Sequence, residues 1–186
     1  MFAQPADCFL PHPEKWTVED LLRLPEDQGN RIELVDGLVV VSPSPNSRHQ
    51  RVLQKLQVAF IAATPPEFET LPGVNVVLNN ERLLIPDLVV LNAPGVDAVY
   101  YKGSDVLLAL EIHSPSTRTF DLALKRQLYA EAGIPFLMFV DPKTGVPAMR
   151  LLELDGEGFR EIASSTAGVL TASQPFPLKL DLVGAR

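Results

Sequence analysis

The chain has 186 residues, of which 46% are apolar and 21% charged, which suits one domain with a complete core and excludes a largely disordered protein. Its longest apolar runs have the length of a strand, which excludes a membrane-spanning helix and predicts no membrane partner. The single cysteine, Cys8, excludes an intramolecular disulfide and a cysteine-based zinc site. The net charge of −7 counts against binding of nucleic acid unless a basic groove or a metal held by carboxylates offsets it.

The start of the chain predicts an irregular lead-in over residues 1–15, followed by one domain over residues 16–186. No basic segment followed by an apolar stretch stands there, so we expect no signal peptide and a cytoplasmic protein. Thr17 and Asp20 have the spacing of a capping box and predict a short helix that ends at Pro25.

A β-hairpin and a longer helix are predicted next. Asp36-Gly37 separates the apolar runs 31–35 and 38–41 and supplies the positive φ angles of a type I′ turn. After a proline-rich break, apolar residues recur at helical spacing over residues 47–63. The residues predicted to share one face of this helix are Val52, Leu56, Phe60 and Ala63.

The second half of the chain predicts mostly strands. These predicted strands are residues 74–78, 82–91, 105–113, 136–140, 149–154, 158–162 and 178–182. A helix is predicted over residues 120–132 with Gly133 as its C-cap, and it lies between two apolar strands as in a βαβ crossover. The order of elements predicts an α/β (α+β) fold with a mixed β-sheet flanked by helices.

Glu111 lies in the most apolar of these strands. Alternation along a strand places residues 105, 107, 109, 111 and 113 on one face and residues 106, 108, 110 and 112 on the other. An unpaired carboxylate in such surroundings is costly, so Glu111 needs a cation, a hydrogen-bond network or an open end of the sheet. The alternative without a function is a carboxylate bonded to nearby backbone.

A second isolated acid, Asp87, follows Pro86 in another apolar strand. Proline cannot donate to a sheet ladder and marks a strand start, an edge or a bulge, and bulges are common beside active sites. If the two strands pair, Asp87 and Glu111 converge, and two close carboxylates require a proton or a metal between them. The pair therefore predicts a site for Mg²⁺ or Mn²⁺, against the alternative of two unrelated acids.

Pro86-Asp87 followed by Glu111 resembles the PD-(D/E)XK nuclease motif, and the segments around it resemble the Uma-type family of putative restriction endonucleases over residues 16–155. The segments that carry this resemblance are residues 33–37, residues 42–43, His49, residues 86–90, residues 111–117, Asp121 with Lys125 and Tyr129, and residues 140–142. The resemblance implies a restriction-endonuclease-like core with an N-terminal helix and hairpin, and a Mg-dependent endodeoxyribonuclease with DNA as its partner.

The same resemblance implies roles around Glu111. Asp87 and Glu111 would ligate the metal, and the carbonyl of Ile112 would be a third ligand. The general motif has lysine two residues after the acid, whereas this chain has His113 there. His113 could act as a neutral base or a metal ligand, or equally be a hydrogen-bonded strand histidine.

Two further charged residues receive catalytic roles from the resemblance. Lys125, in the predicted helix, matches a lysine that replaces the motif lysine in this family, and its alternative is an ion pair with Asp121 within the helix. Glu33 resembles an extra acid that completes the metal shell or orients water. Its alternative is a hairpin acid paired with Arg31 or Arg82.

Substrate-binding residues are expected at two helix starts. Arg48, Arg51 and Lys55 recur at helical spacing and form a basic stripe that could meet a phosphate backbone, with a solvated helix face as the alternative. His49 lies beside this stripe. Residues 114–117 lead into a helix N-terminus, which is a phosphate-binding feature, and Ser114 is the candidate residue there.

The expected reaction is metal-assisted hydrolysis of DNA phosphodiester bonds. A homodimer is expected as well, because two sites cut both strands of a duplex more easily than one. The alternative is a catalytically inactive nuclease-fold protein that binds nucleic acid or another protein. This alternative is favoured by His113 in the place of the motif lysine and by the net charge of −7.

Overall fold

The computed structural model describes residues 14–24, 30–42, 44–113, 120–142 and 146–184, so nearly all of the predicted lead-in lies outside it. Its α-helices are α1 (Val18–Leu22), α2 (Ser47–Ala63) and α3 (Phe120–Glu131). Thr17 and Asp20 form the predicted capping box of α1, and α2 has the predicted bounds. Within these ranges, none of the helices has the length and apolar character that crossing a bilayer demands.

A six-stranded mixed sheet forms the centre of the molecule, in the order β11-β10-β9-β8-β6-β3. Its strands are β3 (Glu69–Pro72), β6 (Leu88–Leu91), β8 (Val106–Ile112), β9 (Phe136–Asp141), β10 (Ala148–Asp155) and β11 (Gly158–Ser164). β8 and β9 are parallel, with α3 between them in the chain, whereas the other neighbours are antiparallel. The predicted βαβ crossover is therefore confirmed.

A second, five-stranded sheet has the order β2-β1-β5-β4-β7. Its strands are β1 (Arg31–Val35), β2 (Leu38–Ser42), β4 (Val76–Asn79), β5 (Arg82–Leu84) and β7 (Tyr101–Lys102), the last followed by the 3-10 turn η1 (Gly103–Asp105). In the β1–β2 turn, Asp36 and Gly37 have φ angles of 51° and 79°, which the predicted type I′ turn requires. A further antiparallel pair consists of β12 (Val169–Ala172) and β13 (Leu178–Asp181).

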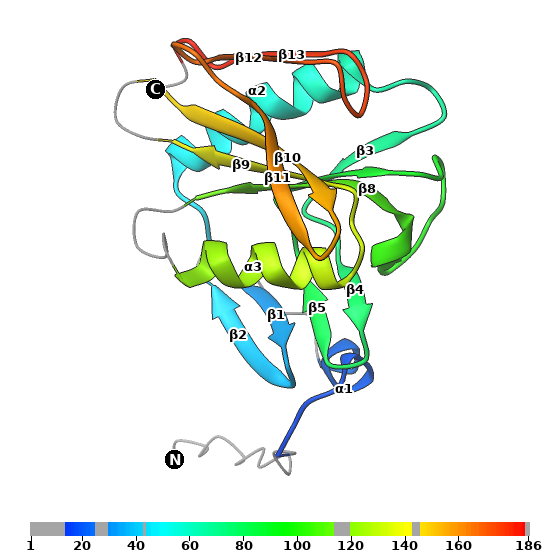
Figure 1. Cartoon of the computed structure of the whole chain (residues 1–186). Coiled ribbons are helices and arrows are strands. Elements are labelled where there is room, and N and C mark those ends of the chain that lie inside the picture. Colours follow the sequence, from blue (N-terminus) through cyan, green and yellow to red (C-terminus); the bar gives the residue numbers. More distant parts are fainter. Residues whose placement is uncertain (1–13, 25–29, 43, 114–119, 143–145, 185–186) are drawn as a thin grey trace, which may run out of the picture.

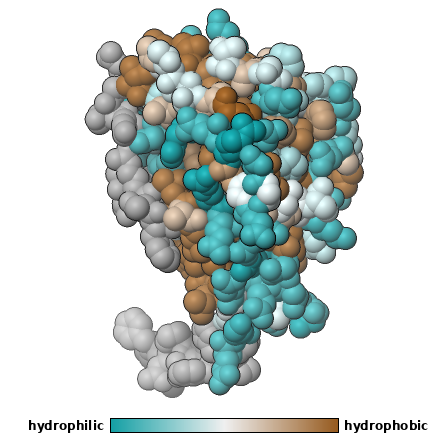
Figure 2. Space-filling view, in the orientation of Figure 1, coloured by the Kyte–Doolittle hydropathy of each residue, from teal (hydrophilic) through white to brown (hydrophobic). Residues whose placement is uncertain are grey.

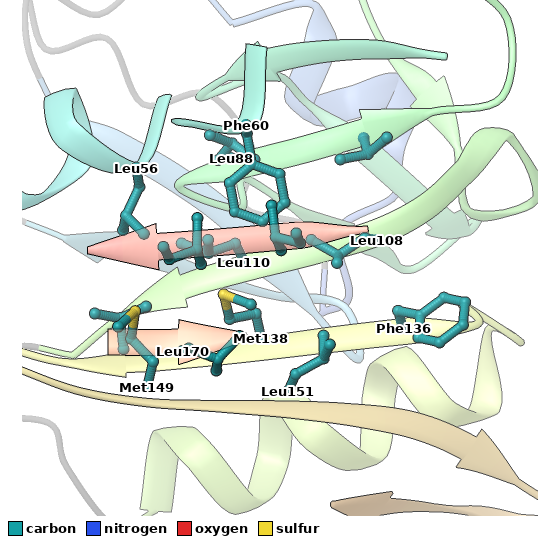
Figure 3. Close-up of a cluster of buried hydrophobic side chains, with 14 of the residues drawn as sticks. Leu56, Phe60, Leu88, Leu108, Leu110, Phe136, Met138, Met149, Leu151 and Leu170 are labelled. Carbon is teal, nitrogen blue, oxygen red and sulfur yellow. The ribbon is translucent and has the colours of Figure 1, made fainter. Parts of the chain in front are cut away.

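The central sheet lies between α2 on one face and α3 on the other (Figure 1). On the α2 face, side chains of the helix, the sheet and the β12–β13 pair form one apolar cluster (Figure 3). Val52, Leu56 and Phe60, from the predicted apolar face of α2, are fully buried in it. On the α3 face, a second cluster joins that helix to both sheets. Each large apolar side chain buried in these clusters contributes roughly 1.5–3 kcal/mol to the stability of the fold, compared with an exposed one.

The strand predicted over residues 82–91 is wrong at its centre, because the chain there forms β5 and β6, which belong to different sheets. Residues 85–87 carry the chain from one sheet to the other. Pro86 has no N–H to donate to a ladder, which explains the break. Three short strands, β3, β7 and β12, were not predicted, because two to four residues carry little periodicity.

The alternation predicted along β8 holds over residues 108–112 and is wrong at the first two residues of the strand. The register with β6 shifts between Val90 and Leu91, which leaves Leu107 as an extra residue in β8. This bulge places Val106 in the cluster on the α3 face and Leu107 against the cluster on the α2 face, the reverse of the prediction.

Candidate functional site

Asp87 and Glu111 come together where β6 and β8 pair. Asp87 directly precedes β6, Leu88 pairs with Leu110, and Glu111 is the next residue of β8. The main-chain N–H of Ile112 donates to Asp87 Oδ2 at 2.7 Å, which fixes this carboxylate against β8. Asp87 and Glu111 are only 1% and 6% exposed. The predicted convergence of the two acids is therefore confirmed, and their role as metal ligands stays a prediction.

Two basic side chains from different elements hold Asp87. Arg31, at the start of β1, donates from Nη1 to Asp87 Oδ1 at 2.8 Å. His49, in the first turn of α2, places Nε2 3.1 Å from Asp87 Oδ2. Burial alone would raise the pKa of Asp87, but the hydrogen bond from His49 and the charge of Arg31 outweigh it and lower this pKa to about 2. Asp87 is therefore ionised near neutral pH.

Glu111 meets a lysine and a tyrosine from α3. Lys125 Nζ lies 3.1 Å from Glu111 Oε1, and the Tyr129 hydroxyl donates to the same oxygen at 2.6 Å. Burial raises the pKa of Glu111 to about 7, against the attraction of the Lys125 charge. The carboxylates of Asp87 and Glu33 act in the same direction as burial. Burial also raises the pKa of Tyr129, so its hydroxyl keeps its proton.

Glu33, on β1, belongs to the same cluster. Its Oε1 accepts from Lys125 Nζ at 3.2 Å and from the main-chain N–H of Ile85 at 2.9 Å. Lys125 therefore bridges two buried acids that come from different sheets. The alternative pairing of Glu33 with Arg31 or Arg82 is wrong, because those guanidinium groups form their ion pairs with other carboxylates.

The remaining candidates near Glu111 have different surroundings. The ring of His113 packs against Phe139, with centroids 5.1 Å apart. The main-chain N–H of Ile112 is bonded to a site carboxylate, whereas the metal-ligand role of its carbonyl stays a prediction. Ser114 and the side chain of Asp121 lie outside the part of the chain that the structure describes, so the alternative ion pair within α3 is not tested.

The basic stripe predicted on α2 starts beside this cluster. Arg51 and Lys55 are exposed and Arg48 is half-buried, while His49 reaches the carboxylates from the same turn. Lys55 Nζ donates to the carbonyl of Val183 at 3.0 Å, so one member of the stripe also contacts the fold. Contact of this stripe with nucleic acid stays a prediction.

The donor chemistry of Asp87 and Glu111 fits a cation of the Mg²⁺ type, which takes one or two carboxylates and keeps several waters. Both are hard oxygen donors, and a cation would relieve the cost of burying an ionised Glu111. Among the described residues, no group of three or more His, Cys, Asp or Glu side chains is arranged to hold a metal ion. The side-chain ligands of a metal here would therefore be the two carboxylates, and its other ligands would be main-chain carbonyl, water and phosphate oxygens.

Two residues of the cluster, Arg31 and Tyr129, received no site role from the sequence. Tyr129 lies four residues after Lys125, so both belong to one face of a helix, and this spacing could have assigned it. Arg31 lies two residues before Glu33, so the two residues share one face of a strand. Both spacings are present in the sequence. Neither residue needs a role in the site, because a tyrosine on the apolar face of a helix and an arginine at the start of a strand are ordinary structural features.

Comparison with known proteins agrees with this architecture. The model of the Uma2 family, described as a putative restriction endonuclease, matches residues 18–182. The fold is similar to the crystal structure of a putative nuclease belonging to DUF820 from Anabaena variabilis, with a TM-score of 0.63 and 15% identity. That likeness covers 78% of this chain and 83% of the other, and it confirms the predicted restriction-endonuclease-like fold. No curated protein matches the chain at a significant level.

Proposed function

Since the chain belongs to the Uma2 family of putative restriction endonucleases, we propose that it is a metal-dependent endonuclease that hydrolyses DNA phosphodiester bonds. The observation that carries the proposal is the burial of Asp87, directly before β6, and of Glu111, on β8, at the point where these two strands pair. A fold has no structural need for two adjacent buried acids, because each carries a desolvation cost that apolar residues avoid. A divalent cation that is held by both carboxylates and also binds the substrate phosphate would explain why such a pair is buried here.

The proposed ligands of Mg²⁺ or Mn²⁺ are Asp87 and Glu111, with the carbonyl of Ile112 as a third. When bound, the metal supplies Lewis-acid polarisation of a phosphoryl oxygen and an acidified water. His49 and the Ile112 N–H hold Asp87 Oδ2, so the carboxylate keeps one orientation. Tyr129 does the same for Glu111 Oε1.

Lys125 is the proposed replacement for the motif lysine. Its ammonium group lies between Glu33 and Glu111, where it can steady an attacking water or the charge that develops on the phosphate. Glu33 would orient that water through the same ammonium group. His113 is the second candidate for the base, because a neutral imidazole can accept a proton near pH 7.

DNA is the proposed partner, and α2 is the proposed contact element. Arg48, Arg51 and His49 lie in its first turns, so a phosphate backbone that follows the stripe would lead to Asp87. Ser114, ahead of α3, is a further candidate for phosphate binding. These local positive charges are what would offset the net charge of −7.

A homodimer in the cytoplasm is the proposed form of the enzyme. β2 is the outer strand of its sheet in the described part of the chain, and Leu38, Val40 and Val41 are exposed there. Figure 2 shows apolar side chains gathered over this hairpin, low on the left of the molecule. An open apolar edge strand pairs readily with another strand, and a second copy could pair with it across a two-fold axis. Val40→Lys should then turn a dimeric molar mass in solution into a monomeric one.

Nicking of supercoiled plasmid with Mg²⁺ or Mn²⁺ tests the activity. Asp87→Ala and Glu111→Ala should each lower the rate about a thousandfold, because each removes a proposed metal ligand. Asp155→Ala, at an exposed acid paired with Arg160, is the matched control and should keep the rate within about twofold. Cutting by Asp87→Ala at the wild-type rate would refute the assignment.

A nuclease fold without activity is the second candidate. His113 in the motif position favours it, and so does the engagement of both Asp87 and Glu111 by resident cations. Such an interaction module needs no metal at these acids. Titration of the wild-type protein and of Asp87→Ala with Mn²⁺ separates the two candidates, because only the nuclease should lose a binding site on substitution.

A further inference from the structure

Arg31 is the basic side chain of the cluster that solvent reaches most easily. Its side chain is 26% exposed, compared with 10% for Lys125 and 10% for His49, whereas its partner Asp87 is 2% exposed. Arg31 therefore lies between the buried carboxylates and the outside of the protein. A molecule that approaches Asp87 from solvent meets this guanidinium group.

The bonds of Asp87 are divided between its two oxygens. Oδ2 accepts from the Ile112 N–H at 2.7 Å and lies 3.1 Å from His49 Nε2. Among the described residues, Oδ1 has Arg31 as its hydrogen-bond partner, through Nη1 at 2.8 Å. Release of Arg31 would therefore free Oδ1 while Oδ2 keeps the carboxylate in place.

The guanidinium group has more donors than Asp87 uses. Arginine carries five N–H donors in a planar fork that matches carboxylate and phosphate groups equally well. The hydrogen bond that Arg31 forms within the described part of the chain uses Nη1. Its other donors suit a second anion, and its exposed fraction gives that anion access.

The charges of the cluster indicate when such an anion would bind. Glu33, Asp87 and Glu111 share two permanent cations, Arg31 and Lys125. When all three acids are ionised, a divalent metal at Asp87 would turn this balance from negative to positive and repel the guanidinium group. An external anion beside Arg31 would restore the balance.

We propose that Arg31 exchanges one anion for another: it holds Asp87 Oδ1 in the metal-free protein and binds a phosphate of the DNA backbone once a metal holds Asp87. This role rests on the proposed nuclease function. It makes Arg31 both a competitor of the metal and a substrate-binding residue. Removal of Arg31 should therefore change metal affinity and DNA affinity in opposite directions, which a merely structural residue would not do.

Two binding experiments on the full chain test the exchange. In the first, Mn²⁺ is titrated into wild type and Arg31→Gln without DNA, and the variant should bind Mn²⁺ about tenfold more tightly. In the second, a labelled duplex oligonucleotide is titrated with Ca²⁺ present in place of Mg²⁺. Arg31→Gln should bind it about tenfold more weakly and lower the slope of log K against log salt by about 0.9, the loss of one phosphate contact.

Arg160→Gln is the matched control. Arg160 is an exposed arginine paired with Glu153 and Asp155, so this variant has the same change of net charge without touching the cluster. Its Mn²⁺ affinity and salt slope should equal those of wild type. If Arg31→Gln does not fold, Arg31→Lys replaces it. This variant keeps the charge but not the fork, so its Mn²⁺ affinity should stay near wild type and its DNA affinity should fall about threefold.

The results of these experiments distinguish failure of the Arg31 exchange from failure of the proposed nuclease function. Equal Mn²⁺ and DNA affinities in wild type and Arg31→Gln, or equal DNA affinities in wild type and Arg31→Lys, would overturn the exchange while leaving the nuclease intact. A wild-type protein that binds neither Mn²⁺ nor duplex would refute the proposed function itself. The exchange would be supported if Arg31→Gln binds Mn²⁺ more tightly and duplex DNA more weakly than wild type while Arg160→Gln shows neither change.

Discussion

The two faces of the central sheet are built from the same strands but bury different chemistry. On the α2 face, the buried cluster is apolar from α2 to β13. On the α3 face, apolar residues surround Glu111, Lys125 and Tyr129, whose polar atoms bond to one another. One strand, β8, contributes Leu110 to the first face and Glu111 to the second.

Because of this difference, Leu110, which stabilises the fold, and Glu111, which is proposed to take part in the chemistry, lie on opposite faces of the same strand. Successive residues of a strand point to opposite faces, so a single residue step leads from an apolar core to a charged cluster. Apolar burial stabilises the fold, whereas buried ion pairs often contribute nothing or cost stability compared with apolar residues. Truncation of a buried apolar side chain on the α2 face and neutralisation of the buried carboxylate on the α3 face should therefore have opposite effects on stability. Two variants test this, and a third tests a hydrogen bond to that carboxylate.

The largest effect on stability is expected from Phe60→Ala on the α2 face (Figure 3). Phe60 is fully buried, so its truncation should lower the free energy of unfolding by about 3–5 kcal/mol. Urea unfolding of the metal-free protein measures this loss. Ile61→Ala, at an exposed neighbour, is the control and should change it by less than about 0.5 kcal/mol. A parallel loss of Mn²⁺ affinity in folded Phe60→Ala would contradict the separation of the two faces.

A smaller effect of opposite sign is expected from Glu111→Gln on the α3 face. The pKa of Glu111 is raised from 4.5 to about 7 in the folded protein, so the folded state binds more protons than the unfolded state between these values. Stability of the metal-free wild type should therefore fall as the pH rises from about 5 to 7. Glu111→Gln should lack this slope and be more stable at pH 8, by on the order of 2 kcal/mol.

Glu111→Gln should also bind Mn²⁺ more weakly, because it lacks a proposed metal ligand, so the substitution raises stability and lowers metal affinity. Asp87 does not disturb the measurement, because its pKa of about 2 confines the pH dependence of its own contribution to stability to pH values below about 4. That contribution is lost as the pH falls and has the opposite sign. A wild-type stability that stays constant between pH 5 and pH 8 would show that burial of Glu111 carries no cost.

The smallest effect is expected from Tyr129→Phe, which removes one hydroxyl group. Its loss takes one donor from Glu111 Oε1, which should cost about 1 kcal/mol of stability and raise the pKa of Glu111 further. Mn²⁺ binding should weaken about threefold because the carboxylate is less firmly oriented. Tyr101→Phe is a close control, since the Tyr101 hydroxyl donates to the Val96 carbonyl at 2.6 Å. Equal Mn²⁺ affinities in Tyr129→Phe and Tyr101→Phe would show that Tyr129 does not contribute to metal binding.

The long elements of the fold followed from local patterns in the sequence. The capping box at Thr17, the Asp36-Gly37 turn and the apolar spacing of α2 are each contained in a few neighbouring residues, and each is confirmed. The break at residues 85–87 was not predicted, because the apolar run on both sides reads as one strand. Pro86 marks a strand start, an edge or a bulge, but it does not show that the residues on its two sides belong to different sheets, which is a tertiary property.

The candidate site was predictable where its residues stand out from their surroundings. Asp87 and Glu111 are isolated acids in apolar strands, and their convergence followed from pairing of those strands. Arg31 and Tyr129 do not stand out, because an arginine at a strand start and a tyrosine on the apolar face of a helix are ordinary. Their spacing from Glu33 and Lys125 is present in the sequence, but their place in the site also depends on how β1 and α3 lie against β8.

The three residues between β5 and β6 limit where the chain can tolerate insertions and deletions. They join two sheets and end at Asp87, whose bonds to Arg31 and Ile112 link those sheets directly. One inserted residue would shift Asp87 out of reach of one partner or move a whole sheet. Surface turns such as the one at residues 155–158 have no such constraint, since they close a single hairpin. Relatives of this protein should therefore differ in length at their hairpin turns and agree in length here.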